Sequence, residues 1–171
     1  MSLEFELRLK KPVAILAHKA LLNTYYTASC LKKKAGEFLR PFGLTDVQFN
    51  LMMLLRHQSG SAEGLSQAQI SDMMLVNRAN ITSLMDRMEK VDLVVRTPDP
   101  NDRRSNIVKL TGKGRKLLSK IEPLYIDQVR QIMAALKQAD QENLIKMLEK
   151  IRHSIPEQSA LEARRFDAAE V

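Results

Sequence analysis

The sequence has too few cysteines for a disulfide and no apolar run long enough to span a membrane. Only one of its 171 residues is a cysteine, Cys30, so no internal disulfide can form. No uninterrupted apolar run approaches the roughly 20 residues that span a bilayer, and the N-terminus lacks the pattern of a secretion signal. We therefore expect a protein of the reducing cytoplasm with no membrane partner.

Signatures of catalysis and of metal binding are also missing. The chain contains no HExxH, GxSxG, P-loop or GxGxxG motif. Its three histidines, His18, His57 and His153, are scattered, and no Cys/His spacing of the zinc-ribbon or zinc-finger kind is present. We expect no catalytic residue, no metal ligand and no cofactor. A metal-sensing switch is kept as an alternative.

Charge is unevenly distributed along the chain. Lys and Arg number 27 against 20 Asp and Glu, a formal net charge of +7. Between Arg96 and Lys116, seven basic residues stand against two acidic ones, whereas acidic residues prevail from Glu157 onward. This concentration of positive charge in the middle of the chain favours a polyanionic partner.

The first part of the chain has helical periodicity. We expect one long helix that begins at Pro12, a favourable first helical residue, and ends at about Arg40 before Pro41. Cys30 falls in this helix, where we expect a small buried hydrophobic residue and not a redox sensor. Residues 45–48 have the form of a capping box, which predicts a second helix to about His57.

Two short helices are expected after a polar loop over residues 58–64. Residues 66–69 repeat the capping-box pattern at the start of the first, and Asn77 is the expected N-cap of the second. An apolar stripe in the second helix should be buried, and it consists of Ile81, Leu84, Met85 and Met88. Two short helices, the second with a polar outer face, are typical of a helix-turn-helix.

A hairpin and two further helices complete the pattern. The β-prone runs 93–97 and 105–110 flank a turn-rich segment, which predicts a hairpin with a basic tip. From Thr111 the helical period returns, in a long helix that Pro123 can kink because it lacks a backbone donor. Asp140 is the expected N-cap of a last helix.

Several motifs in fixed order resemble the MarR (multiple antibiotic resistance regulator) family. They are Leu93-Val94-Val95-Arg96, Asp102-Arg103-Arg104, Val108-Lys109-Leu110-Thr111-Gly112-Lys113-Gly114 and, upstream, Gly43-Leu44-Thr45-Asp46-Val47-Gln48-Phe49. The resemblance covers roughly residues 13–153. One departure is Asp92, where the family usually has Gly. Asp tolerates the left-handed conformation better than most residues, so we expect the turn to survive.

The resemblance implies a mainly α (α+β) fold: a winged helix-turn-helix core with long N- and C-terminal dimerisation helices. We expect an N-terminal dimerisation helix in residues 1–43 and a DNA-binding domain in residues 44–112. Residues 113–171 would form the C-terminal dimerisation helices and tail.

The same resemblance implies how DNA would be bound. Residues 77–90 would enter the major groove, while the hairpin tip reaches the adjacent minor groove. Ser66, Gln67 and Lys113, at helix starts, would hold phosphates. The remaining candidates are Arg78, Asn80, Thr82 and Ser83 for base edges, Asn77 and Arg87 on the same helix, Arg103 and Arg104 in the wing, and Asp102 as an orienter of the wing arginines.

We therefore expect a homodimer that binds a pseudo-palindromic double-stranded operator as a transcriptional regulator. The resemblance implies a repressor released by a small amphipathic or phenolic effector, bound between the dimerisation and DNA-binding parts. A different class of function also fits, a helical protein-interaction module whose basic wing binds an acidic partner. A gel shift with the DNA upstream of the gene separates the two.

Overall fold

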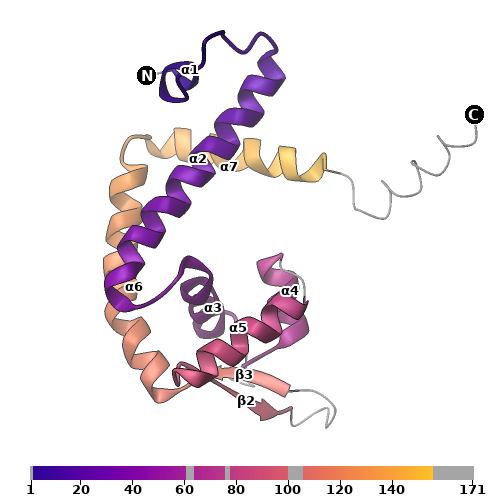
Figure 1. The fold of residues 1–171 in the computed structure, drawn as a ribbon, viewed down its shortest axis with the longest axis vertical. Coiled ribbons are helices and arrows are strands. Elements are labelled where there is room, and N and C mark those ends of the chain that lie inside the picture. The colour runs from indigo at the N-terminus through magenta and orange to yellow at the C-terminus, as the bar shows by residue number, and fades with distance from the viewer. Residues whose placement is uncertain (1, 61–63, 76–77, 100–105, 156–171) are drawn as a thin grey trace, which may run out of the picture. The chain divides into compact units, whose positions relative to one another are not determined.

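A computed structural model describes residues 2–60, 64–75, 78–99 and 106–155 (Figure 1). The chain divides into two compact units, Met1–Ile121 and Glu122–Val171. The elements, in chain order, are α1 (Leu3–Glu6), α2 (Leu16–Leu39), the 3-10 helix η1 (Arg40–Phe42), α3 (Asp46–His57), β1 (Leu65–Ser66), α4 (Gln67–Met74), α5 (Arg78–Lys90), β2 (Val94–Pro98), β3 (Asn106–Leu110), α6 (Gly112–Met133) and α7 (Gln138–His153).

Both predicted capping boxes are present. The Gln48 backbone N–H donates to Thr45 Oγ1 (3.3 Å) while Gln48 Oε1 accepts from the Thr45 backbone N–H (2.9 Å), which begins α3. Ser66 and Gln69 form the same reciprocal pair at 3.2 and 2.8 Å, which begins α4. Each box satisfies two backbone donors that would otherwise lack a helical acceptor.

The wing is a small antiparallel sheet in the order β1-β3-β2. The predicted hairpin is confirmed, with Val94 opposite Leu110 and Arg96 opposite Val108. Sequence patterning missed β1, whose two residues, Leu65 and Ser66, pair with Val108 and Ile107. A strand this short carries too little alternation to be recognised.

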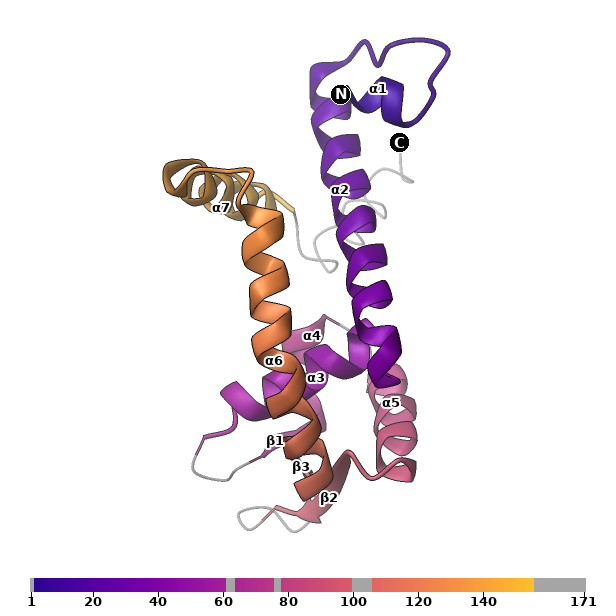
Figure 2. The ribbon, with the colours of Figure 1, turned by 90° about the vertical axis from the view of Figure 1, so that its left-hand side faces the viewer.

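One core holds the helix-turn-helix against this sheet. The predicted stripe of α5 is buried, with Ile81, Met85 and Met88 fully inaccessible and Leu84 nearly so. Phe49, Leu51 and Met52 of α3, Val108 of β3 and Leu118 of α6 are also buried in this core. Figure 2 shows β1, β3 and β2 beneath α3, close to the first turns of α6. The mainly α fold class, with its winged helix-turn-helix core, is confirmed.

Two predicted helix starts are wrong. The first long helix begins at Leu16, not Pro12, because the backbone is still extended at Ile15, and no capping side chain marks this start in the sequence. The last helix begins at Gln138 after Lys137, whose carbonyl accepts from the backbone N–H groups of residues 140 and 141. Asp140 therefore lies inside the first turn, where its negative charge complements the helix dipole.

The structure also shows the environment of Cys30 and the course of the helix at Pro123. Cys30 is exposed in the single chain, which corrects the expected buried position. The helix α6 continues through Pro123 as one element.

Candidate DNA-binding interface

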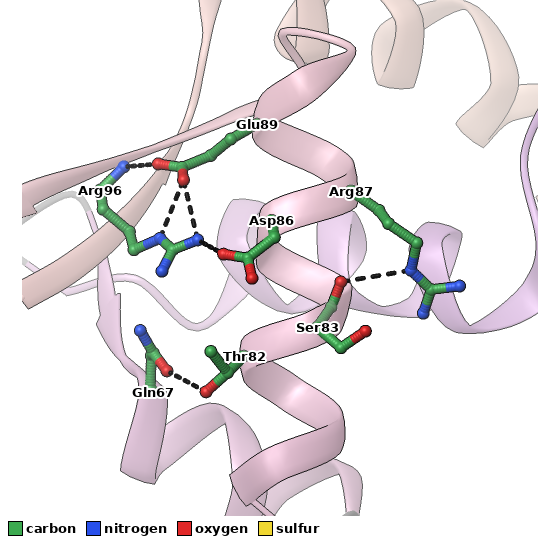
Figure 3. Close-up of polar contacts among 7 residues, drawn as sticks. All are labelled: Gln67, Thr82, Ser83, Asp86, Arg87, Glu89 and Arg96. Carbon is green, nitrogen blue, oxygen red and sulfur yellow. Dashed lines mark hydrogen bonds and ion pairs between the residues drawn. The ribbon is translucent and has the colours of Figure 1, made fainter.

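The two helices of the helix-turn-helix are linked by a polar contact between predicted site residues. Thr82 Oγ1 donates to Gln67 Oε1 at 3.2 Å, which joins the first residue of α4 to the second turn of α5 (Figure 3). Ser66 directly precedes Gln67 and caps α4. The structure therefore brings Ser66, Gln67 and Thr82 together at one edge of the motif.

The outer face of α5 is polar and exposed, as predicted. Asn80, Thr82, Ser83 and Arg87 are all exposed, and Arg87 Nε donates to the Ser83 carbonyl oxygen at 3.2 Å. In Figure 3 the guanidinium of Arg87 extends to the opposite side of α5 from Arg96. Arg78 is the first residue of α5, but its side chain and the whole of Asn77 lie outside the described part of the chain.

Arg96 of β2 is clamped by two carboxylates of α5. Its guanidinium pairs with Asp86 and, at 2.8 Å from Nη2, with Glu89 Oε2, while Arg96 Nε donates to the same Glu89 oxygen at 2.9 Å. The Arg96 backbone N–H donates to Glu89 Oε1 at 2.8 Å. The hydrogen bond that Arg96 donates to the Asp86 carboxylate is the main cause that raises the pKa of Arg96 above its ordinary value. We call these three residues the Arg96 clamp.

The Arg96 clamp changes the charge that α5 presents. The helix α5 carries two acidic residues, Asp86 and Glu89. It also carries three basic residues, Arg78, Arg87 and Lys90. Carboxylates on a helix that lies in the major groove would repel phosphates. Arg96 pairs with both carboxylates from the wing strand and offsets one of their two negative charges. With Arg78, Arg87 and Lys90 the region stays net positive, and the same ion pairs tie the helix to the wing.

A second set of contacts anchors the wing strands at the start of α6. Thr111 Oγ1 donates to the Asp92 carbonyl oxygen (2.7 Å) and accepts from the Gly114 backbone N–H (2.9 Å), while the Thr111 backbone N–H donates to the Leu93 carbonyl oxygen (3.1 Å). Asp92 has a φ of 58°, so the left-handed turn expected at this position is present without Gly. Gly114 is buried, and a Cβ there would collide with the Leu93 carbonyl oxygen.

Lys113, a predicted phosphate contact, is part of this anchor. It is exposed, and its Nζ donates to the Val91 carbonyl oxygen at 2.7 Å. An ammonium group has three donors, so this bond fixes the side chain and leaves it able to donate to an anion.

The wing tip, with Asp102, Arg103 and Arg104, lies outside the described residues. Sequence reasoning missed the roles of Asp86, Glu89 and Gly114. The sequence placed Arg96 in the basic stretch and in the Leu-Val-x-Arg motif, but it did not indicate that Arg96 pairs with α5.

A helix-turn-helix followed by a two-stranded wing defines a winged helix protein. Comparison with known proteins extends this assignment. A family model described as "MarR family" matches residues 42–105, which include α3, α4, α5 and β2.

Curated relatives are transcription regulators. The chain is 28% identical over 116 residues to the HTH-type transcriptional regulator MhqR of Bacillus subtilis, covering 68% of this chain and 77% of MhqR. It is 33% identical over 100 residues to the transcriptional activatory protein BadR of Rhodopseudomonas palustris (58% and 57%) and 32% identical over 108 residues to the HTH-type transcriptional repressor NicR of Pseudomonas putida (63% and 66%). The matched part thus spans less than two thirds of some of these relatives.

Solved structures share the fold. AbsC of Streptomyces coelicolor, a MarR family transcriptional regulator, superposes with a TM-score of 0.74 at 21% identity, covering 84% of this chain and 97% of AbsC. MepR of S. aureus, solved as a complex with DNA, superposes with a TM-score of 0.69 at 23% identity, covering 77% and 95%. The chain therefore belongs to the MarR family of winged helix transcription regulators.

Proposed function

We propose that this protein is a homodimeric, sequence-specific regulator that binds a pseudo-palindromic double-stranded operator. The observation that carries the proposal is the exposed polar face of α5, where Arg96 pairs with both acidic residues, so that four cations (Arg78, Arg87, Lys90 and Arg96) stand against two acids. Its relatives are transcription regulators, and MepR was solved with DNA. The same relatives favour a regulator that carries out no catalysis and acts in the cytoplasm, where the DNA is.

The proposed contacts divide between phosphates and bases. Ser66, Gln67 and Lys113 hold phosphates at helix starts, whereas Asn80, Thr82 and Ser83 with the start of α5 read base edges. Arg103 and Arg104 of the wing enter the minor groove, oriented by Asp102. Residues 1–43 and 113–171 supply the dimer interface on either side of the DNA-binding domain, residues 44–112.

The proposal includes repression that a small amphipathic or phenolic molecule relieves. NicR is named as a repressor and BadR as an activator, so the relatives by themselves support either sign. A transcription assay with the isolated promoter decides between them. Repression is supported if added protein lowers transcript yield, and activation if the yield rises.

Fluorescence anisotropy tests DNA binding with a labelled duplex from the region upstream of the gene and a scrambled duplex of equal length. We expect tighter binding to the native duplex, with half-site centres about 10 bp apart or a multiple of that. Asn80→Ala should cost about 1–3 kcal/mol on the operator and little on the scrambled duplex. Arg104→Ala should weaken both and reduce the salt slope by about one unit per lost phosphate contact.

Two results would count against this proposal. Equal affinity for the native and the scrambled duplex would refute the proposed sequence specificity. An unchanged affinity and salt slope in folded, dimeric Arg104→Ala protein would leave the wing without a role in binding, as expected for a protein-interaction module.

A further inference from the structure

Three lysines lie on one face of the first turns of α6. Lys113, Lys116 and Lys120 are spaced three and four residues apart, so they share a helix face, and with Leu117 they line a depression of about 540 Å³. All three lysines are exposed, whereas Leu117 is partly buried. Lysine stems cover apolar surface while their ammonium groups stay in water, so the depression is bordered by cations. We call Lys113, Lys116 and Lys120 the lysine row.

No acidic group neutralises the lysine row. Residues 112–121 contain no Asp or Glu. In the described part of the chain, the side chains of Lys116 and Lys120 have no ion-pair or hydrogen-bond partner, and Lys113 donates to a neutral acceptor, the Val91 carbonyl oxygen. An ammonium group carries three donors, so all three lysines can donate to an anion. A run of cations without acids favours a polyanion as the partner.

The lysine row begins where α5 ends. Val91, whose carbonyl oxygen holds Lys113, directly follows Lys90, the exposed last residue of α5. A helix of 13 residues is about 20 Å long, which exceeds the roughly 12 Å width of the major groove. When the start of α5 contacts bases, its end therefore lies beside the phosphate backbone at the edge of the groove.

The length of the lysine row suits a phosphate backbone. From Lys113 to Lys120 the axis of α6 rises by about 10 Å. Each DNA strand carries one phosphate for about every 3.4 Å of helix axis, so the row is as long as about three phosphates.

We propose that the lysine row binds the DNA phosphate backbone beyond the groove in which α5 reads bases. This rests on the proposed function and extends the interface by two residues, Lys116 and Lys120. Ammonium groups bind phosphates as point charges, so the row adds affinity for every sequence and does not distinguish one base from another. An acidic protein segment would match the charge as well, but the position of the row at the end of α5 favours DNA.

Anisotropy titrations at several salt concentrations test the lysine row in the full-length protein, with the native and the scrambled duplex. Lys116→Gln/Lys120→Gln removes two charges per chain and four per dimer. Since each neutralised phosphate contributes about 0.9 to the slope of log affinity against log salt, the slope should become shallower by about three to four units. At low salt the affinity for both duplexes should fall at least about tenfold. Lys116→Arg/Lys120→Arg keeps the charges and should bind within about twofold of wild type.

Lys146→Gln/Lys150→Gln is the matched control. It removes the same charge from two exposed lysines with the same spacing, on the face of α7 opposite Leu144 and Leu148. This control should change the salt slope by less than about one unit. Thermal unfolding and sedimentation of every variant show that the fold and the dimer are kept, which is expected because all four substituted lysines are exposed.

The proposal is overturned if folded, dimeric Lys116→Gln/Lys120→Gln protein keeps the affinity and salt slope of wild type, or if the control on α7 lowers the slope equally. Unchanged DNA affinity together with lost binding to poly-L-glutamate would overturn it in favour of an acidic protein partner. The proposed function is tested separately in the same titrations. Wild-type protein that binds both duplexes equally contradicts sequence specificity, whereas the change in slope still decides whether the lysine row binds phosphates.

Discussion

The helix-turn-helix core and the terminal helices differ in how far one chain can bury their apolar residues. In α5, which has 13 residues, the apolar stripe is inaccessible at Ile81, Met85 and Met88. In α2, which has 24 residues, only Leu39 is buried, and α7 buries none of its residues. Exposed apolar side chains on these two helices include Leu16, Leu21, Tyr25, Leu31, Ile145, Met147 and Ile151.

This difference separates a domain that is complete in one chain from helices that are not. Single exposed apolar residues are common on proteins, but rows of them along helices mark interfaces. A second copy of the chain is the simplest cover for both helices, because a two-fold dimer pairs identical surfaces and also presents two recognition helices to a palindrome. We therefore expect substitutions in the terminal helices to weaken the dimer and substitutions in the core to lower the stability of the fold.

The largest effect is expected in the terminal helices. Ile145 is 55% exposed in the single chain, and burial of an isoleucine contributes about 1.5–3 kcal/mol. Because the dimer contains the residue twice, Ile145→Glu should raise the dimer dissociation constant at least about 100-fold and weaken operator binding accordingly. Analytical ultracentrifugation over a range of concentrations measures this, with the exposed Ala139→Glu on the same helix as control.

The oligomeric state of the wild-type protein tests the same prediction. A stable monomer at micromolar concentration would refute the dimer. A dimer that Ile145→Glu and Ala139→Glu leave equally intact would place the interface away from this part of α7.

Substitutions in the helix-turn-helix core should lower the stability of the fold and should not dissociate the dimer. A Cβ at Gly114 would collide with the Leu93 carbonyl oxygen, whereas a Cβ at Gly112 would meet nothing within 4 Å. Gly114→Ala should therefore cost about 2–3 kcal/mol and lower Tm by about 5–10 °C. Gly112→Ala, two residues away on the same helix, should leave Tm unchanged or slightly higher. Equal Tm values for the two variants would contradict the close packing of α6 on the α5–β2 turn.

The sequence predicted best what depends on local chemistry. Both capping boxes, the buried stripe of α5 and the hairpin were found because each leaves a signal within a few residues. Helix starts without a side-chain cap, at Leu16 and Gln138, gave no such signal, and β1 was too short to show one.

Contacts between distant residues could not be read from the pattern. The exposed residues predicted for DNA on α5 were identifiable from periodicity, since they occupy the face opposite the stripe. The Arg96 clamp was not, because residues 86, 89 and 96 meet only when the hairpin folds back on α5. Gly114 stood in a recognised motif, but its reason, the nearby Leu93 carbonyl, is visible only in three dimensions.

The Arg96 clamp should affect both stability and DNA binding. Arg96 has a side chain only 22% exposed, and its charged hydrogen bonds hold β2 on α5. Arg96→Met should cost about 1–2 kcal/mol of stability, a value reduced for partial exposure, and should weaken all duplexes because two carboxylates on α5 lose their partner. Arg87→Met, which removes an exposed arginine of the same helix, should weaken DNA binding with Tm unchanged.

Adding Asp86→Asn to Arg96→Met separates the two effects of the clamp. Removal of the unpaired carboxylate should recover part of the lost DNA affinity while stability stays low. If Arg96→Met binds DNA as tightly as wild type, the clamp has a structural role alone.

The smallest effect, and the sharpest test of the interface, concerns Thr82, where the two helices of the motif meet. Because its hydroxyl donates to Gln67 Oε1, we expect the hydroxyl to serve the helix-turn-helix and the methyl group to contact a thymine methyl in the major groove. Thr82→Val keeps the shape and removes the hydroxyl, so it should lower stability by about 0.5–1 kcal/mol with operator affinity within about twofold. Thr82→Ser keeps the hydroxyl and removes the methyl, so it should leave stability unchanged and weaken the operator about fivefold, with little effect on a scrambled duplex. Thermal unfolding and anisotropy on the same samples measure both quantities. The reverse pattern, normal binding by Thr82→Ser and weak binding by Thr82→Val, would mean that the hydroxyl leaves Gln67 to bind a base in the complex.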